Sequence, residues 1–165
     1  MELTEALAKL LRSYEKYYDI NRENPVKPFA AEAEFSLHDE QYFLVRSARI
    51  SEADSKEYVY FATEEQLDIQ TLEALDQKAW ENGTGKVNPH KDHRNSDVIL
   101  MIIANRIDPA AMKRISGLRH YKSYRHGFYG WSHYKLAAIE LSTGKTAANR
   151  QGRDLKKLFS TILSN

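Results

Sequence analysis

A run of seven consecutive apolar residues, from Val98 to Ala104, constrains the fold more than any other stretch of this sequence. The run is rich in β-branched side chains, and it is far shorter than the roughly 20 apolar residues of a membrane span. Such a run is typical of a strand that is buried on both faces. We therefore expect it at the centre of a sheet that carries helices on both sides.

Shorter patterns on either side of this run predict the other elements. Apolar residues that alternate with polar ones, or that cluster between turn residues, predict further strands at residues 29–37, 42–50, 56–62, 134–141 and 146–149. Apolar residues at helical spacing, together with capping and proline signals, predict helices at residues 3–19, after a capping box at Thr63 and Gln66, from Pro109, and at 155–162. In the first hairpin, Glu32 would face Arg46 as a cross-strand ion pair.

The order of these elements predicts an α+β fold (mixed α/β). Three consecutive strands fit an antiparallel meander, and the helix that leads to Val98 suits a crossover to a parallel neighbour. We expect a central mixed sheet with helices on both faces. With 165 residues, the chain has the length of a single globular domain, residues 1–165.

The composition of the chain excludes several kinds of chemical site. The chain has no cysteine, which excludes disulfides, thiolate nucleophiles and cysteine-bound metal centres. No window is apolar enough for a membrane span, and the N-terminal stretch has neither a positive leader nor a cleavage site. We expect no membrane partner, a cytoplasmic location and no cofactor.

Charge is divided unequally along the chain. Residues 108–165 carry 11 Lys and Arg against three Asp and Glu, so this third is a cation, whereas residues 1–107 have a net charge of −7. Two interpretations remain open. The basic third could bind an anionic partner, or it could pair with the acidic part, within one chain or across a homodimer.

The basic third contains a segment in which cations alternate with aromatic residues, from residue 114 to 135, and no acidic side chain lies between Asp108 and Glu140. Cations hold phosphates, and aromatic faces stack on unpaired bases. We predict a polyanion-binding surface made of Arg119, Lys122, Arg125, Arg150, Tyr121, Tyr124 and Trp131. The alternative is that Phe128, Trp131 and Tyr134 belong to the core and that the cations lie over them.

Two other motifs have simpler interpretations. Residues 82–96 predict a long polar loop in which His90, Asp92 and His93, with Asp97 nearby, lack the spacing of a helical zinc site, so we predict a solvated loop and no metal. Gly144-Lys145-Thr146 lacks the earlier glycine of a phosphate-binding loop, because that position is Ile139. A hairpin turn is the expected structure there.

Two resemblances accompany these patterns. The order helix, three strands, helix, strand over residues 3–105 resembles the core of the PD-(D/E)xK nucleases, whose carboxylates and lysine hold a divalent metal. The one acid-x-Lys triplet here, Asp76-Gln77-Lys78, lies in a predicted helix. Residues 127–152, with Gly130-Trp131, the Ser-Thr-Gly-Lys turn and Asn149-Arg150-x-Gly152, resemble the C-terminal part of a small bacterial family of uncharacterised domains.

These observations predict a non-catalytic module that binds nucleic acid or another polyanion. A metal-dependent nuclease or phosphohydrolase with an unidentified site is one alternative, and a homodimeric interaction protein is another. The sequence alone leaves open whether the chain is an enzyme.

Overall fold

The computed structural model describes residues 1–35, 54–89 and 93–164. In these parts of the chain, seven strands form one mixed sheet in the order β1-β2-β3-β4-β6-β5, and β7 also pairs with β6. The strands are β1 Tyr18–Asn21, β2 Ala31–Phe35, β3 Asp54–Leu67, β4 His93–Ile107, β5 Tyr121–Ser123, β6 Trp131–Glu140 and β7 Thr146–Ala148. The helices are α1 Leu3–Arg12, α3 Ile69–Gly85, α4 Pro109–Ile115, α5 Ser160–Leu163, and the 3₁₀ helices η1 Arg125–Gly127 and η2 Arg150–Phe159.

The apolar run from Val98 to Ala104 lies in β4 at the centre of the sheet, as predicted. Its side chains are buried on both faces. β4 is parallel to β3 on one side and to β6 on the other, whereas β1, β2 and β3 are antiparallel in series. Helix α3 makes the crossover between the parallel strands β3 and β4.

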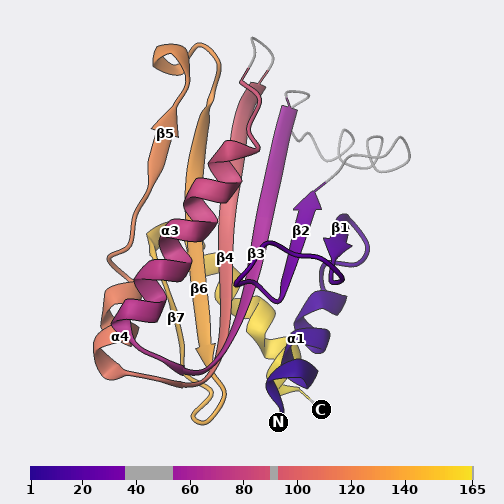
Figure 1. Cartoon of the computed structure of the whole chain (residues 1–165), viewed down its shortest axis with the longest axis vertical. Helices are drawn as coiled ribbons and strands as arrows, with labels where there is room; N and C mark the ends of the chain where they lie inside the picture. The colour runs from indigo at the N-terminus through magenta and orange to yellow at the C-terminus, as the bar shows by residue number, and fades with distance from the viewer. Residues whose placement is uncertain (36–53, 90–92, 165) are drawn as a thin grey trace.

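Two hydrophobic clusters cover the two faces of the sheet. Side chains of α3 and α4 pack with Tyr60, Leu100 and Leu136 on one face, which we call the α3 face. Side chains of α1, η2 and α5 pack with Phe61 and Met101 on the other, which we call the α1 face. Figure 1 shows α3 and α4 in front of the sheet and the C-terminal helices behind it. The α+β class and the mixed sheet with helices on both faces are thereby confirmed.

The first helix is shorter than predicted, because its tyrosine-rich end does not continue as a helix. Helix α1 ends at Arg12, and Tyr18 begins strand β1 opposite Phe35. Tyr14 is buried edge-on against Phe61, with ring centroids 5.1 Å apart. The antiparallel unit therefore uses β1 as its first strand. The predicted strand at residues 42–50, and with it Arg46 as the expected partner of Glu32, lies outside the described residues.

The predicted capping box is wrong, because strand β3 continues through Thr63 and Gln66 to Leu67. Asp68 caps α3 instead, since its carboxylate accepts a hydrogen bond of 2.7 Å from the backbone N–H of Thr71. Strand β3 continues this far because Thr63, Gln66 and Leu67 each pair with a residue of β4.

The predicted loop at residues 82–96 is shorter than expected, because α3 continues to Gly85 and β4 begins at His93. Gly83 lies inside the helix, where an added Cβ would come within 2.6 Å of a methyl group of Val98. This glycine allows the helix to approach the central strand closely and does not end the helix. The loop residues His90 and Asp92 lie outside the described residues.

The C-terminal elements agree with the patterns, except at the last helix. Gly144 adopts a φ of 76° in the turn between β6 and β7, as a hairpin requires. The last helical stretch begins at Arg150, before the predicted residue 155, because the Asn149 side chain caps it with a 2.9 Å bond from the N–H of Gly152.

Candidate polyanion-binding surface

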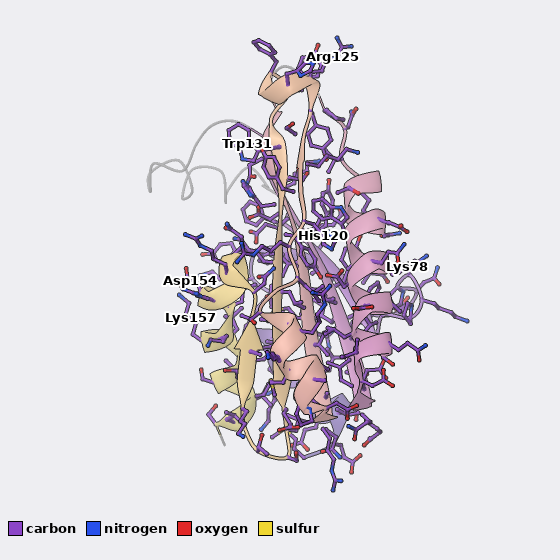
Figure 2. The ribbon with its side chains drawn as sticks, turned by 90° about the vertical axis from the view of Figure 1, so that its left-hand side faces the viewer. Lys78, His120, Arg125, Trp131, Asp154 and Lys157 are labelled. Atoms are coloured by element: carbon purple, nitrogen blue, oxygen red, sulfur yellow. The ribbon has the colours of Figure 1, made fainter. Side chains whose placement is uncertain are left out.

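Strands β5 and β6 form a hairpin that extends to one end of the molecule. Figure 2 shows Arg125 at its tip, Trp131 lower on it, and His120 lower still, toward α3. At the tip, Arg125, His126 and Gly127 have φ values of 49°, 54° and 92°. Left-handed backbone at residues other than glycine costs about 1 to 3 kcal/mol and is concentrated at functional sites.

The hairpin displays large aromatic side chains to solvent. Tyr121 is 61% exposed, Phe128 is 81% exposed and Trp131 is 37% exposed. Across the strands, Tyr121 lies opposite His133, with ring centroids 5.4 Å apart, and the rings of His133 and Trp131 are 6.4 Å apart. We call Tyr121, Trp131 and His133 the aromatic platform. Of the three rings that were the candidates for core residues, Tyr134 alone is buried.

Positive side chains lie on the same hairpin as the platform. Lys122 is in register with Ser132, so it points to the opposite face of the strands from the platform. The Lys122 ammonium lies 5.5 Å from the ring centroid of Tyr124, and the Arg125 guanidinium lies 5.2 Å from that of Tyr129. Arg119 and Arg150 are exposed near the base of the hairpin. Within the described residues, no carboxylate lies at ion-pair distance from Arg119, Lys122, Arg125 or Arg150.

Other cations of the basic third pair with the acidic part of the same chain. Lys135 lies 3.1 Å from Asp97, and Arg114 lies 3.4 Å from Glu73. Part of the charge asymmetry is therefore neutralised internally, as one of the two interpretations expected. Within the described residues, Lys122 and Arg125, the two cations nearest the tip of the hairpin, do not take part in this pairing.

Tyr124 has a structural position that differs from its predicted role. It is 8% exposed, and its hydroxyl hydrogen-bonds the hydroxyl of Ser132 at 2.8 Å. A ring at this depth does not offer a free face to a base. Tyr124 thus supports the hairpin from inside, and the exposed stacking surface consists of the other aromatic residues.

A cavity of about 350 Å³ opens at the edge of the sheet, below the platform. It is lined by Arg119, His120, Tyr121, His133, Tyr134, Asn149, Arg150 and Gln151. The fold therefore brings three predicted site residues, Arg119, Tyr121 and Arg150, into one cavity. Lys122, Arg125 and Trp131 lie on the hairpin outside its lining.

Asn149 builds the floor of this edge cavity. Strands β5 and β7 pair with different stretches of β6, and between them the Asn149 side chain accepts from the Leu136 N–H at 3.0 Å and donates to the Tyr134 carbonyl at 3.3 Å. A second donation, at 3.0 Å, reaches the carbonyl of Leu118. Gly152 packs so tightly that an added Cβ would lie 2.5 Å from the Leu136 carbonyl. The sequence Asn149-Arg150-x-Gly152 thus fixes the edge of the sheet.

A buried polar contact that no sequence pattern predicted lies beside the cavity, between Asp76 and His120. Asp76 of α3 is 5% exposed, and its Oδ2 lies 2.8 Å from Nε2 of His120, whose ring stacks on Trp80 with a centroid distance of 5.2 Å. Burial raises the pKa of Tyr134 well above its usual value, and the Asp76 carboxylate raises it further. Asp76 and His120 are 44 residues apart, so no local motif indicated their contact.

The second acidic position of interest, Asp97, belongs to β4 and not to a loop. Glu57 lies beside it in register on β3, and the Tyr18 hydroxyl donates a 2.8 Å hydrogen bond to Glu57. Burial raises the pKa of Glu57, the hydrogen bond from Tyr18 opposes this shift, and the charge of Asp97 adds to it. His93 begins β4. In the described ranges, no group of three histidine, aspartate or glutamate side chains is placed to hold a metal ion.

Helices in the described parts of the chain are too short or too polar to span a membrane.

Comparison with curated proteins and with solved structures finds no match. A family model, by contrast, matches residues 2–161, which is nearly the whole chain, in agreement with the resemblance to a family of uncharacterised domains. The chain therefore belongs to the family described as a domain of unknown function, DUF8052.

Proposed function

We propose that this domain is a non-catalytic module that binds single-stranded nucleic acid on the β5–β6 hairpin. The observation that carries the proposal is the exposure of Tyr121, Phe128 and Trp131 on a projecting hairpin. Lys122 and Arg125 of this hairpin have no carboxylate partner within the described residues, whereas Lys135 pairs with Asp97. Exposed aromatic faces among cations suit a ligand that is both anionic and planar.

The energetics favour a single strand over a duplex. Each base that stacks on an aromatic side chain contributes about 1 to 3 kcal/mol, and only an unpaired base has a free face to stack. Lys122, Arg125, Arg119 and Arg150 would neutralise phosphates, so binding should weaken steeply as salt is added. The absence of acidic residues between Asp108 and Glu140 supports this, because no carboxylate of the segment repels the phosphates.

Fluorescence anisotropy with a labelled single-stranded oligonucleotide tests the proposal. In 50 mM salt, the double variant Lys122→Glu and Arg125→Glu should lose at least about tenfold in affinity, because two attractive charges become repulsive. The matched control is Lys78→Glu with Lys113→Glu, which makes the same charge change on exposed positions of α3 and α4. This control should lose much less affinity.

Two results would contradict the proposal. The wild-type domain could show no binding to single-stranded DNA or RNA at low salt. Alternatively, the control pair could lower affinity as much as the hairpin pair, which would mean that net charge and not the hairpin governs binding.

A further inference from the structure

We infer that the edge cavity is a nucleotide site, which holds one nucleoside monophosphate unit with Arg119 and Arg150 as phosphate ligands and Tyr121 as the stacking ring. The unit could be a free nucleotide or the phosphorylated end of a nucleic-acid strand. The second source rests on the proposed function of the hairpin, whereas the first does not.

The two arginines are brought to one cavity by a specific hydrogen bond. Arg119 follows Leu118, and Arg150 follows Asn149. The Asn149 side chain donates to the Leu118 carbonyl at 3.0 Å, so the two segments are joined immediately before each arginine. Both arginines line the cavity, and both are exposed. Guanidinium groups bind phosphate through paired N–H donors, which makes two arginines that line one cavity a suitable phosphate site.

The remaining lining suits the rest of a nucleotide. The cavity volume of about 350 Å³ is within the usual range for small-molecule sites, which begins at roughly 300 Å³. Tyr121 offers an exposed ring, and Gln151 offers an amide that both donates and accepts. Among the residues that the structure describes, no aspartate or glutamate lines the cavity. An anion that carries a planar, hydrogen-bonding ring fits this set better than a cation or an apolar ligand.

Hydrogen bonds within the protein hold the frame of the cavity. Asn149 is 1% exposed, and its side chain makes four hydrogen bonds, to Leu118, Tyr134, Leu136 and Gly152. Elsewhere in the lining, the contact between His120 and Asp76 holds the residue between Arg119 and Tyr121. A preorganised frame lowers the entropic cost of ordering the site on binding.

The position of the cavity relative to the hairpin indicates how a strand would use it. Tyr121 belongs both to the aromatic platform and to the cavity lining, so the two surfaces are continuous. A strand stacked on Trp131 and His133 would therefore bring its next nucleotide to Arg119 and Arg150. A terminal phosphate carries more charge than an internal one and should be preferred there.

Isothermal titration with free nucleotides is the first test. AMP and UMP should bind, and adenosine and uridine should bind at least about tenfold more weakly, because they lack the phosphate that the arginines hold. Arg119→Ala and Arg150→Ala should each lower AMP affinity at least about tenfold. The control Arg153→Ala removes an exposed cation of η2 that does not line the cavity, and it should leave AMP affinity unchanged within about twofold.

Oligonucleotides with and without a terminal phosphate provide the second test. A phosphorylated end should raise affinity about fivefold or more, and the double variant Arg119→Ala with Arg150→Ala should abolish this gain. If AMP binds but neither oligonucleotide does, the cavity inference stands and the proposed function of the hairpin fails. If oligonucleotides bind equally with or without the phosphate and AMP does not bind, the inference is overturned while the proposed function stands. Equal binding of adenosine and AMP would also overturn it.

Discussion

The side chain of Asn149 occupies the place of a missing strand beside Leu136, whose backbone N–H donates to its Oδ1 at 3.0 Å. The backbone of Asn149 completes the pair by donating to the Leu136 carbonyl, also at 3.0 Å. Between β5 and β7, the edge of β6 is therefore satisfied by one residue, through both its side chain and its backbone. The base of the hairpin depends on this residue, since the same amide also holds Leu118.

Replacement of Asn149 with alanine should lower the free energy of unfolding by roughly 3 kcal/mol, because buried N–H and carbonyl groups of β6 lose their partner. Urea denaturation monitored by circular dichroism measures this change. Asn88→Ala, at an exposed position, is the control and should change stability by less than about 0.5 kcal/mol. Equal stability of the two variants would show that water replaces the Asn149 side chain without cost.

Gly152 and Gly85 offer a matched pair of alanine substitutions. At Gly152, a new Cβ would lie 2.5 Å from the Leu136 carbonyl, so Gly152→Ala should destabilise the domain and displace Asn149. At Gly85, no atom lies within 4 Å of the new Cβ, and alanine should be tolerated or slightly stabilising at this end of α3. Thermal unfolding compares them. A Gly152→Ala variant as stable as Gly85→Ala would contradict the close approach.

The central strand makes a prediction about packing. Ile102 is fully buried among residues of the α3 face, so Ile102→Ala should cost about 2 to 5 kcal/mol through lost apolar contact and the cavity that remains. Ile69→Ala removes the same atoms at a position that is 39% exposed, and it should cost far less. Denaturant midpoints with unchanged slopes provide the measurement.

The raised pKa of Glu57 predicts that the stability of the fold depends on pH. Because burial raises its pKa in the folded state, the folded protein holds this proton more tightly than the unfolded chain. The contribution of Glu57 to stability is therefore greatest below its unfolded pKa, near pH 4, and is lost as the pH rises through its folded pKa. Glu57→Gln removes this loss and keeps an acceptor for Tyr18, so it should stabilise the domain at pH 7.

Denaturant titrations of the wild type and Glu57→Gln at several pH values between 4 and 8 give this comparison. The stability difference between the two proteins should be larger at pH 7 than at pH 4. Glu23→Gln, on an exposed turn, should show no such trend. A difference that grows as the pH falls would mean that the Glu57 carboxylate is stabilising when ionised.

Alanine substitutions of two hairpin tyrosines should distinguish an effect on nucleic-acid binding from an effect on stability. Tyr121→Ala removes an exposed ring, so it should weaken the binding of single-stranded DNA by about 1 to 3 kcal/mol. It should affect the binding of duplex DNA less and leave the stability of the fold unchanged. Tyr124→Ala removes a buried ring and its bond to Ser132, so it should mainly lower thermal stability. Anisotropy titrations and melting curves of both variants test this. The reverse assignment of effects would remove Tyr121 from the binding surface.

The sequence predicted those parts of the fold that local patterns determine. The apolar run of β4, the helix start at Pro109 and the turn at Gly144 are each recognised within a few residues. Tyr14 and Tyr18 matched a helical stripe equally well, and only their contacts with Phe61 and Phe35 placed them beyond α1. Helical periodicity cannot show where a chain leaves the helix when tertiary packing decides it.

The sequence predicted which residues belong to the candidate site, but not the contacts that position them. The alternation of cations and rings indicated Arg119 and Tyr121, and the basic C-terminal third indicated Arg150; the fold does bring the three to one cavity. The contact between Asp76 and His120, and the role of Asn149 at the sheet edge, depend on strand order and on helices that cross between distant segments. No spacing along the chain encodes such contacts.

The alternation of β6 between the two faces of the sheet limits how the hairpin can change. Trp131 and His133 lie toward the α1 face, while Ser132 and Tyr134 point into the interior beside α3. Deletion of one residue between them would turn Tyr134 outward and drive His133 into the core, since a shift of one position reverses every side chain of a strand. Single substitutions can therefore change the exposed rings without disturbing the core. Insertions and deletions between Trp131 and the buried part of β6 are excluded.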